Sequence, residues 1–497
     1  MILRFPLSFI CSHPLQMILL TLWLVCYDTQ ALMGQQNDPA SQSREVLQAM
    51  QRATEFMTSH VAVHGGYVYK VTLDLKHRKG EGNATPTEIW VQPPGTPEVG
   101  SAFLDAWEAT HDSQFLDAAQ GCAEALLFGQ LQSGGWADRV DFDPAGKNTG
   151  RYRGDRGKSR GRNYSTLDDD KTQSALRFLI RMDQTMNFQD AELHEAVEFA
   201  LERLLEAQFA NGGFPQGWQQ PVPPGTTMKA SYPEYDWRTE GRIKEYYDYP
   251  TLNDGLAGTV TATLHLAWTT YQNPRYRDAL NRFGDFLILA QLPAPQSAWA
   301  QQYNSQLQPM WARKFEPPAV AGRESEDVIE TLLFLARVSG DKRFLEPVPA
   351  ALTWLKQSQL PDGSIARFYE LRSNRPLYLT RDTYELTYSD ADLPTHYSFK
   401  SRSRVNELEA RYQQALTGQH TAPRGRSLKT LTRDAQQILA ARDEAGRWVT
   451  DDKGRSVTQT SGRDPSKLWL ESRVFSHNLR RLAEFLKTAT PDSRSTP

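Results

Sequence analysis

Carboxylate side chains recur at the predicted starts of four helices along this chain. They are Glu98, Asp168, Asp169 and Asp170, Asp254 beside Asn253, and Glu324, Glu326 and Asp327. If the first helix of every helical pair lies on the inner side of the molecule, the starts of these helices lie at the same opening, and their carboxylates converge there. A convergent set of carboxylate oxygens is what a hard cation such as calcium requires. The other interpretation is that each acid caps its helix or lies in the first turn, where the helix dipole favours negative charge.

The elements that must position these acids are predicted by four stretches that share one plan. Each stretch has apolar residues at helical spacing, a turn marked by Asp or Asn near an aromatic residue, and a glutamine at the end of the second helix. The glutamines are Gln130, Gln208, Gln291 and Gln357. Glycine pairs such as Gly134-Gly135 and Gly212-Gly213 supply the positive φ angles that end a helix. The plan therefore predicts repeated helical hairpins.

We expect these hairpins to close into a ring or an arc. The predicted fold class is all-α dominated, an α/α toroid of repeated helical hairpins with long irregular loops and few short strands, of which residues 66–73 are the clearest. The aromatic residues Trp136, Phe214 and Trp299 follow the repeat glutamines. They are expected to pack under the hairpin turns, with stacking on sugar rings as the alternative.

The N-terminus predicts export. The apolar run Met17–Cys26 follows Arg4 and precedes the small-x-small pattern Thr29–Ala31, so residues 1–31 are expected to be a signal peptide. Its removal leaves Cys122 as the one cysteine of the mature chain, which then forms no internal disulfide. We expect a bacterial protein, secreted or periplasmic. The expected domains are the toroid at 32–400 and a helical extension at 401–497 packed on it.

Charge and hydropathy limit the partners. The chain has 56 Lys and Arg against 59 Asp and Glu, a formal net charge of −3. This balance argues against a protein built as a whole to bind a polyanion, so no nucleic-acid partner is expected. No other segment is long and apolar enough to span a membrane. The basic segment 151–162 is either a solvated loop or a patch that gathers an acidic polysaccharide. We expect a monomer.

Five short motifs, in order along the chain, resemble those of family 10 polysaccharide lyases, the pectate lyases with an α/α toroid. They are Thr166–Thr172, Asn211–Gln216, Tyr249–Asp254, Trp299–Tyr303 with Ala312–Pro318, and Ala366–Glu370 with Asn374–Pro376 and Arg381-Asp382. The matches run from about residue 98 to 385. The resemblance implies cleavage of polygalacturonate by β-elimination with calcium as cofactor.

The resemblance also implies roles for individual residues. Calcium would be held by Asp168, Asp169 and Asp254, and would delocalise the charge that develops when a uronate loses its C5 proton. The substrate would be bound by Arg313, Arg367, Arg375 and Asn253, since arginine binds carboxylates bidentately. The base would be Arg381. Because a guanidinium has a pKa above roughly 12, this role requires that calcium and neighbouring cations lower the pKa sharply.

The chain departs from the family pattern around the acidic motif. Asp169, Asp170 and Lys171 stand where the family has Asn, Gly and Ala. The segment between Phe214 and Asn253, which is rich in aromatic and charged residues at 232–249, is longer than is usual in the family. One alternative is an inverting glycoside hydrolase, in which Asp168 or Asp169 pairs with Asp254 or Glu326 at a separation of about 6.5–9.5 Å. Another is a non-catalytic carbohydrate-binding toroid. A lyase of this family requires the arginines near calcium, whereas a hydrolase requires only the acids.

Overall fold

The computed structural model describes residues 39–146, 151–154, 162–223, 225, 227–418 and 425–489. The predicted signal peptide at 1–31 and residues 155–161 of the basic segment lie outside the described residues. Within the described ranges, no helix combines the length and the apolar character that crossing a membrane requires.

Four helical hairpins follow one another along the chain, as the repeats predict. They are α3 (Thr96–Thr110) with α4 (Ser113–Phe128), α5 (Lys171–Thr185) with α6 (Ala191–Glu206), α7 (Leu256–Tyr271) with α8 (Pro274–Leu289), and α9 (Gly322–Ser339) with the 3-10 helix η5 (Lys342–Leu345) and α10 (Val348–Gln357). An Asp or Asn side chain accepts a backbone N–H at the start of α4, α6, α8 and η5; these residues are Asp112, Asp190, Asn273 and Asp341. Such N-caps satisfy N–H groups that have no partner within the helix.

Three of the four repeat glutamines, Gln130, Gln208 and Gln291, bond their own hairpin to the next one. The Gln208 amide nitrogen donates to the carbonyl of Gly212 at 2.9 Å and to that of Ala279, in α8, at 2.9 Å. Gln130 and Gln291 make the corresponding pairs of bonds. The glutamine thus fixes its own turn and the position of the following hairpin, which explains why this residue type recurs.

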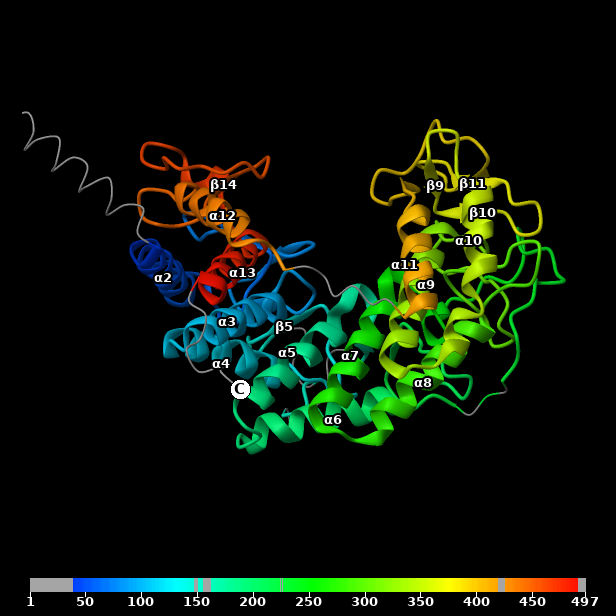
Figure 1. Ribbon diagram of the computed structural model, residues 1–497, viewed down its shortest axis with the longest axis horizontal. Coiled ribbons are helices and arrows are strands. Elements are labelled where there is room, and N and C mark those ends of the chain that lie inside the picture. Colours follow the sequence, from blue (N-terminus) through cyan, green and yellow to red (C-terminus); the bar gives the residue numbers. More distant parts are fainter. Residues whose placement is uncertain are drawn as a thin grey trace, which may run out of the picture.

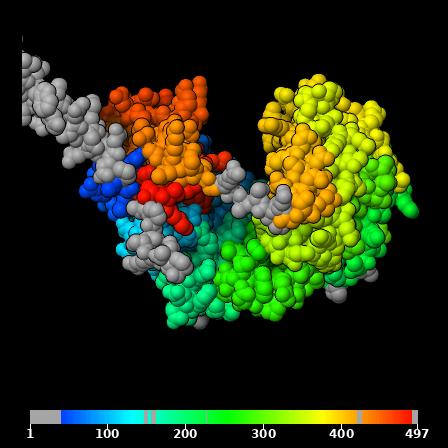
Figure 2. All heavy atoms as spheres, viewed as in Figure 1, coloured from blue at the N-terminus to red at the C-terminus, as the bar shows by residue number. Residues whose placement is uncertain are grey.

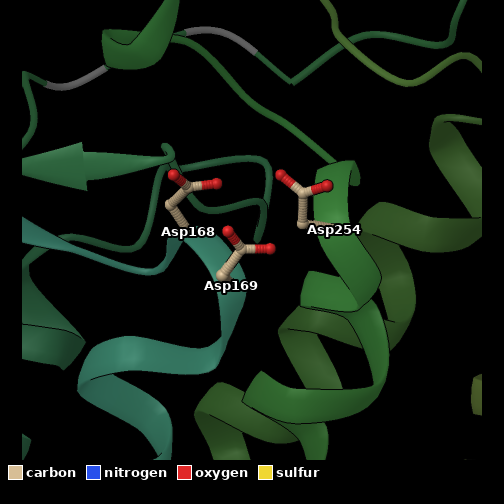
Figure 3. A group of neighbouring side chains, drawn as sticks. All are labelled: Asp168, Asp169 and Asp254. Carbon is tan, nitrogen blue, oxygen red and sulfur yellow. The ribbon is translucent and has the colours of Figure 1, made fainter. Parts of the chain in front are cut away.

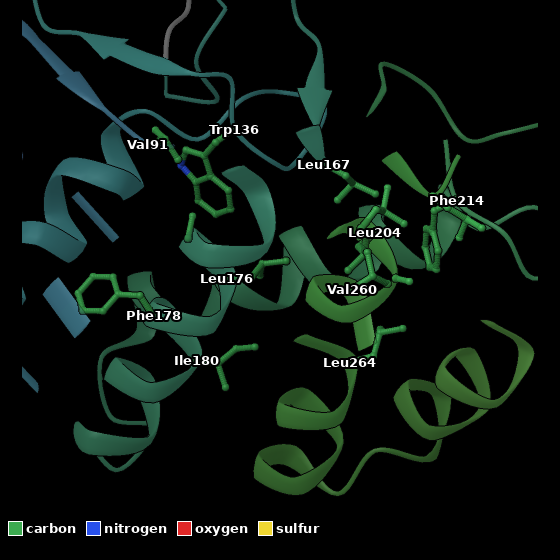
Figure 4. Close-up of a cluster of buried hydrophobic side chains, with 14 of the residues drawn as sticks. Val91, Trp136, Leu167, Leu176, Phe178, Ile180, Leu204, Phe214, Val260 and Leu264 are labelled. Atoms are coloured by element: carbon green, nitrogen blue, oxygen red, sulfur yellow. The ribbon is translucent and has the colours of Figure 1, made fainter. Parts of the chain in front are cut away.

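The aromatic residues after the glutamines are core residues. Trp136, Phe214 and Trp299 have no exposed surface. The indole N–H groups of Trp136 and Trp299 donate to the carbonyls of Leu126 and Leu287 at 2.8 and 2.7 Å. Figure 4 shows Trp136 and Phe214 among the buried side chains between helices. The prediction that these rings pack under the turns is confirmed, and none of them is available to stack on a sugar.

The first helices of the hairpins form the inner layer of an open arc. α3, α5, α7 and α9 pack side by side in chain order, with α13 (Ser472–Ala489) beside α3 and α11 (Val405–Thr417) beside α9. The second helices α4, α6 and α8 lie along the outer side of this arc (Figure 1). Figure 2 shows the surface deeply hollowed between the two ends of the arc. The helix-dominated α/α toroid predicted from the repeats is confirmed, in its open form.

The two ends of the described chain meet at one end of the arc. α2 (Pro39–Phe56) and α12 (Leu428–Ala440) pack on α13, and the short π-helix η1 (Met57–Val61) continues α2. Backbone pairing of Lys70 with Glu471 fastens the N-terminal segment to the C-terminal one. α11 instead lies on α9 and α10, at the other end (Figure 1). Residues 401–418 and 425–489 therefore extend opposite ends of the arc, while the domain boundary at residue 400 stays a prediction.

The strands are short and join loops between helices. β1 (Lys70–Thr72), β2 (Arg78–Lys79), β3 (Asn83–Ala84), β14 (Thr450–Asp451) and β15 (Leu468–Glu471) form an antiparallel sheet in the order β14-β15-β1-β2-β3. β8 (Val320–Ala321), β10 (Phe368–Tyr369), β11 (Pro376–Leu379) and β12 (Leu386–Thr387) form a second sheet in the order β12-β11-β10-β8. The pairs are β13 (Lys400–Arg402) with β9 (Ser364–Ala366), β4 (Glu88–Trp90) with β5 (Arg139–Asp141), and β6 (Ser165–Thr166) with β7 (Gly217–Trp218). The remaining 3-10 helices are η2 (Asp168–Asp170), η3 (Tyr246–Asp248), η4 (Asn253–Gly255) and η6 (Pro465–Lys467). The predicted strand at 66–73 contains β1.

Candidate active site

Two equivalent turns, at the starts of α5 and α7, carry the acidic residues. In each turn a threonine hydroxyl accepts the backbone N–H two residues later, from Asp168 to Thr166 and from Asn253 to Thr251, both at 3.1 Å. The middle residue of each 3-10 turn has a left-handed backbone, with φ of 47° at Asp169 and 51° at Asp254. Aspartate tolerates this conformation better than most residues do. The same local sequence plan therefore produces the same turn twice.

The two turns meet and bring three predicted ligands together. Oxygen atoms of Asp168, Asp169 and Asp254 all lie within 4.8 Å of one another, and within the described ranges they form the one group of three acids, histidines or cysteines close enough to share a metal ion. Figure 3 shows the three carboxylates turned toward the space between η2 and α7. We call these residues the aspartate triad. No aspartate side chain caps η2, α5 or η4, so capping does not explain the triad.

The acids at the other two helix starts do not join the triad. Glu98 pairs with Arg480 of α13. The Glu326 carboxylate accepts the Ser403 hydroxyl and the Arg404 backbone N–H, and so holds the start of α11. Glu324, at the same helix start as Glu326, lies near the triad, because Arg367 bridges it to Asp254. Acids from the other starts therefore lie around the triad or in separate ion pairs, and only the starts of α5 and α7 contribute to the metal-sized group.

Three cationic side chains surround the triad. The Lys171 ammonium lies 3.1 Å from Asp168 Oδ2 and 4.0 Å from Asp169 Oδ2. The Arg313 guanidinium contacts Asp254 Oδ2 at 3.2 Å, and its Nε donates to Glu316 at 2.8 Å. The Arg367 guanidinium is 3.9 Å from Asp254 Oδ1 and only 2.6 Å from Glu324.

The crowding of these charges shifts the pKa values of the three aspartates. Burial raises the pKa of Asp254 to about 8, and the hydrogen bond and the repulsion with Asp168 act in the same direction. Burial also raises the pKa of Asp169, together with the charge of Asp168. For Asp168, burial opposes ionisation, but Lys171, the hydrogen bond with Asp254 and Arg313 together lower the pKa. Two carboxyls this close share a proton when no cation lies between them.

The predicted substrate-binding residues differ in exposure. The Arg313 side chain is 31% exposed, whereas that of Arg367 is 4% exposed and pairs with an equally buried Glu324. Asn253 is 3% exposed. Arg313 can therefore reach a ligand from its present position. Arg367 and Asn253 lie beneath the surface; Arg367 lies beside Asp254, and the Asn253 Oδ1 atom is buried without a hydrogen-bond partner.

Arg375 and Arg381 lie on the loops around β11. The Arg375 guanidinium stacks 3.4 Å from the centre of the Tyr388 ring. Arg381 is half exposed, donates from Nε to the Leu393 carbonyl at 3.1 Å and lies 3.3 Å from Asp392. Within the described residues, no contact joins either arginine to the triad. Their predicted roles in substrate binding and in catalysis stay predictions.

Several supporting residues escape a motif-based analysis. The Gln92 amide donates to Asp169 Oδ2 at 3.1 Å and to Glu81 at 2.9 Å. The Tyr397 hydroxyl donates to Glu316 at 2.9 Å, and its ring lies 4.2 Å from the Arg367 guanidinium. Gln92 and Tyr397 are distant in sequence from the motifs, so no local signal could have identified them.

A cavity of about 640 Å³ opens beside β6 and β7, near the acidic turn. Arg162, Tyr164, Asn211, Trp218, Asp248 and Tyr249 are among its lining residues. The Arg162 guanidinium stacks between the rings of Tyr164 and Tyr247, at 4.3 and 4.8 Å from their centres. Arg162, the last residue of the basic segment 151–162, thus lines a cavity made partly by the long segment before Asn253.

Comparison with known sequence families agrees with the motifs. Residues 130–365 match the sequence model of the family described as pectic acid lyase. A search of curated proteins finds no match to this chain. Among solved structures, a family 10 polysaccharide lyase from Cellvibrio cellulosa is 19% identical with a TM-score of 0.44, covering 64% of this chain and 97% of that one. A mutant of that lyase in complex with trigalacturonic acid has the same identity and TM-score and is covered to 98%. A cellobiose 2-epimerase from Spirochaeta thermophila is 16% identical with a TM-score of 0.42, covering 89% of this chain and 98% of that one.

The family match covers the acidic turns themselves. It includes both turns of the aspartate triad and the loop that carries Arg313, and it ends two residues before Arg367. The prediction of an enzyme of the polysaccharide lyase class is confirmed by this match. Residues 130–365, which hold the triad and Arg313, form a region of the pectic acid lyase family, as the motifs predicted.

Proposed function

We propose that this protein cleaves polygalacturonate or a closely related uronate polymer by calcium-assisted β-elimination at the aspartate triad. One observation carries the proposal. Three carboxylates lie within 4.8 Å of one another and Arg313 lies 3.2 Å from one of them, inside the region that matches the pectic acid lyases. A uronate carboxylate needs cationic partners, and the elimination needs stabilisation of the charge that develops at C5.

The triad has the chemistry of a calcium site. Its donors are all carboxylate oxygens, which hard cations prefer. The Asp168 Oδ1 atom is buried without a hydrogen-bond partner, and such an atom is costly unless something binds it. Asp168, Asp169 and Asp254 would hold the cation. When bound, calcium would neutralise a uronate carboxylate and make the neighbouring C5 proton more acidic.

We assign different roles to Arg313, Arg367 and Arg381. Arg313 is anchored by Glu316 and partly exposed, so it is placed to hold a substrate carboxylate. Arg367 is paired with Glu324 and buried, and we assign it to fixing Asp254 rather than to contact with the polymer. For Arg381 we keep the predicted role of base, which would accept the C5 proton of the bound substrate.

The spacing of the acids favours the lyase over the hydrolase. An inverting glycoside hydrolase needs two carboxyls about 6.5–9.5 Å apart to admit a water molecule. Oxygens of the triad lie within 4.8 Å of one another, and the Glu326 carboxylate is bonded at the start of α11. A surface that only binds sugar, without catalysis, does not require buried ion pairs such as those beside the triad.

The product distinguishes the three functions. Purified protein is incubated with polygalacturonate, with calcium or with a chelator, and the ultraviolet absorbance of a 4,5-unsaturated product is followed. We expect the chromophore to appear with calcium, to be lost with chelator, and to be lost in Asp254→Asn. Glu192→Gln, which changes an exposed acid on α6, serves as the control and should keep full activity.

Other outcomes identify the alternatives. Reducing sugar released without the chromophore would exclude the lyase and support the hydrolase. No release from any uronate polymer would support a binding toroid. Full activity of Arg381→Ala would remove the base assignment while leaving the reaction class in place.

A further inference from the structure

Lys171 is the first residue of α5 and directly follows the acidic turn. Its side chain is only 7% exposed, although lysine is among the residues least often buried. A buried ammonium is costly unless carboxylates compensate it. Here Asp168 Oδ2 lies 3.1 Å away and Asp169 Oδ2 lies 4.0 Å away, so the lysine is held by the triad itself.

The Lys171 ammonium uses oxygens that a metal ion would need. Asp169 Oδ2 also accepts the Gln92 amide at 3.1 Å, and Arg313 contacts Asp254 Oδ2 at 3.2 Å. Each carboxylate of the triad therefore has a donor from this chain. The triad is assembled by internal cations and amides before any external ion arrives.

The excess of acidic side chains around the triad attracts a divalent cation, but the positive charge of Lys171 weakens this attraction. The carboxylates in contact are those of Asp168, Asp169, Asp254, Glu316 and Glu324, and the cations are Lys171, Arg313 and Arg367. Acids thus outnumber cations by two. Replacing Lys171 by a neutral residue would raise the excess of acids and remove an ammonium that repels a second cation at the same oxygens.

We propose that Lys171 is an internal cation that competes with calcium at the aspartate triad. The inference rests on the proposed metal site of the lyase. Binding of the metal ion must displace the ammonium from Asp168 and Asp169, so this chain holds its triad in place without metal and binds calcium more weakly than a variant with a neutral residue at 171.

Calcium binding measured by titration calorimetry tests the inference. In Lys171→Met, which keeps the apolar stem and removes the charge, we expect calcium to bind at least ~10-fold more tightly than in the wild type. Lys171→Arg keeps the charge and should bind as weakly as the wild type or more weakly. Lys429→Met, at an exposed lysine of α12, is the matched control and should leave the affinity unchanged.

A second measurement on the unmodified sequence covers the case in which Lys171→Met fails to fold. An amine-reactive reagent is applied to the wild-type protein with and without calcium, and labelling of Lys171 and Lys429 is quantified by mass spectrometry. Displacement of the ammonium predicts faster labelling of Lys171 with calcium and no change at Lys429. Equal labelling of Lys171 in the two conditions would overturn the inference.

The outcomes separate this inference from the proposed function. If the wild type binds calcium and Lys171→Met binds it no more tightly, the competition is refuted while the calcium-assisted lyase stands. If neither protein binds calcium and the wild type forms unsaturated product in the presence of chelator, the metal in the proposed function is refuted, and the competition with it.

Discussion

The Arg367 guanidinium can serve either in a buried ion pair or in substrate binding, and substitution of Arg367 distinguishes these two roles. The family resemblance assigns Arg367 to substrate binding, but in the structure its side chain is 4% exposed and lies 2.6 Å from Glu324, which is 2% exposed. Its guanidinium also lies 4.2 Å from the Tyr397 ring. Arg367→Met is therefore expected to act first on stability and only then on the substrate.

The magnitude follows from the burial of the pair. Removing one partner of a buried ion pair costs about 3–5 kcal/mol, because the other charge is left without compensation. Arg367→Met should therefore lower the free energy of unfolding by that amount, and Glu324→Gln by a comparable or smaller one, since Asp254 at 3.9 Å still compensates Arg367. The double variant removes both charges and should lie within about 1–2 kcal/mol of the wild type.

Urea unfolding of the four proteins, followed by tryptophan fluorescence, gives the coupling between the two residues. We expect the two single costs to exceed the double cost by at least about 2 kcal/mol. In parallel, Arg313→Ala should raise KM for polygalacturonate while changing stability less, because the Arg313 side chain is 31% exposed. Additive costs, or an Arg367→Met protein within about 1 kcal/mol of the wild type, would show that Arg367 is not committed to Glu324 and is free to bind substrate.

Three further predictions concern the scaffold around the hairpins. Tyr271→Phe removes a 2.6 Å hydrogen bond to the fully buried Asp183 and should cost about 1–3 kcal/mol in the free energy of unfolding. The hydrogen bond to Asp183 raises the pKa of His194, so the stabilising effect of this bond is complete below the unfolded-state pKa of about 6.5 and disappears as the pH rises through the higher folded-state pKa. The difference in unfolding free energy between the wild type and His194→Gln should therefore shrink over that pH range. A difference that grows with pH would contradict this prediction. Gly212 has φ of +91°, and a backbone carbonyl oxygen of α8 would lie 1.9 Å from a Cβ added there. Gly212→Ala should therefore lower the free energy of unfolding by at least about 1 kcal/mol. Gly340→Ala should cost less, because φ is also positive there but nothing lies within 4 Å of an added Cβ. Equal costs at the two glycines would show that the close contact does not matter.

The parts of this protein that the sequence predicts are those set by short-range chemistry. Helix caps, glycine turns and apolar periodicity act over a few residues, so the four hairpins and their glutamine turns follow from local patterns. The acidic turns behave in the same way, because a threonine two residues before Asp168 or Asn253 is enough to build each one. The two turns that carry the triad were therefore predictable from local motifs, whereas their meeting and the approach of Arg313 to Asp254 are long-range contacts.

The tertiary structure decided which charges are available. Glu98 is neutralised by Arg480, which lies 382 residues away, and Glu326 is bonded by residues at the start of α11. Arg367 is buried against Glu324, 43 residues distant. No local pattern specifies such partners, because they are chosen by how the hairpins and the C-terminal helices pack around the arc. Since a charge in a low-dielectric interior is controlled by its nearest partner, only the fold decided which acids lie together in the aspartate triad and which charged residues form structural pairs.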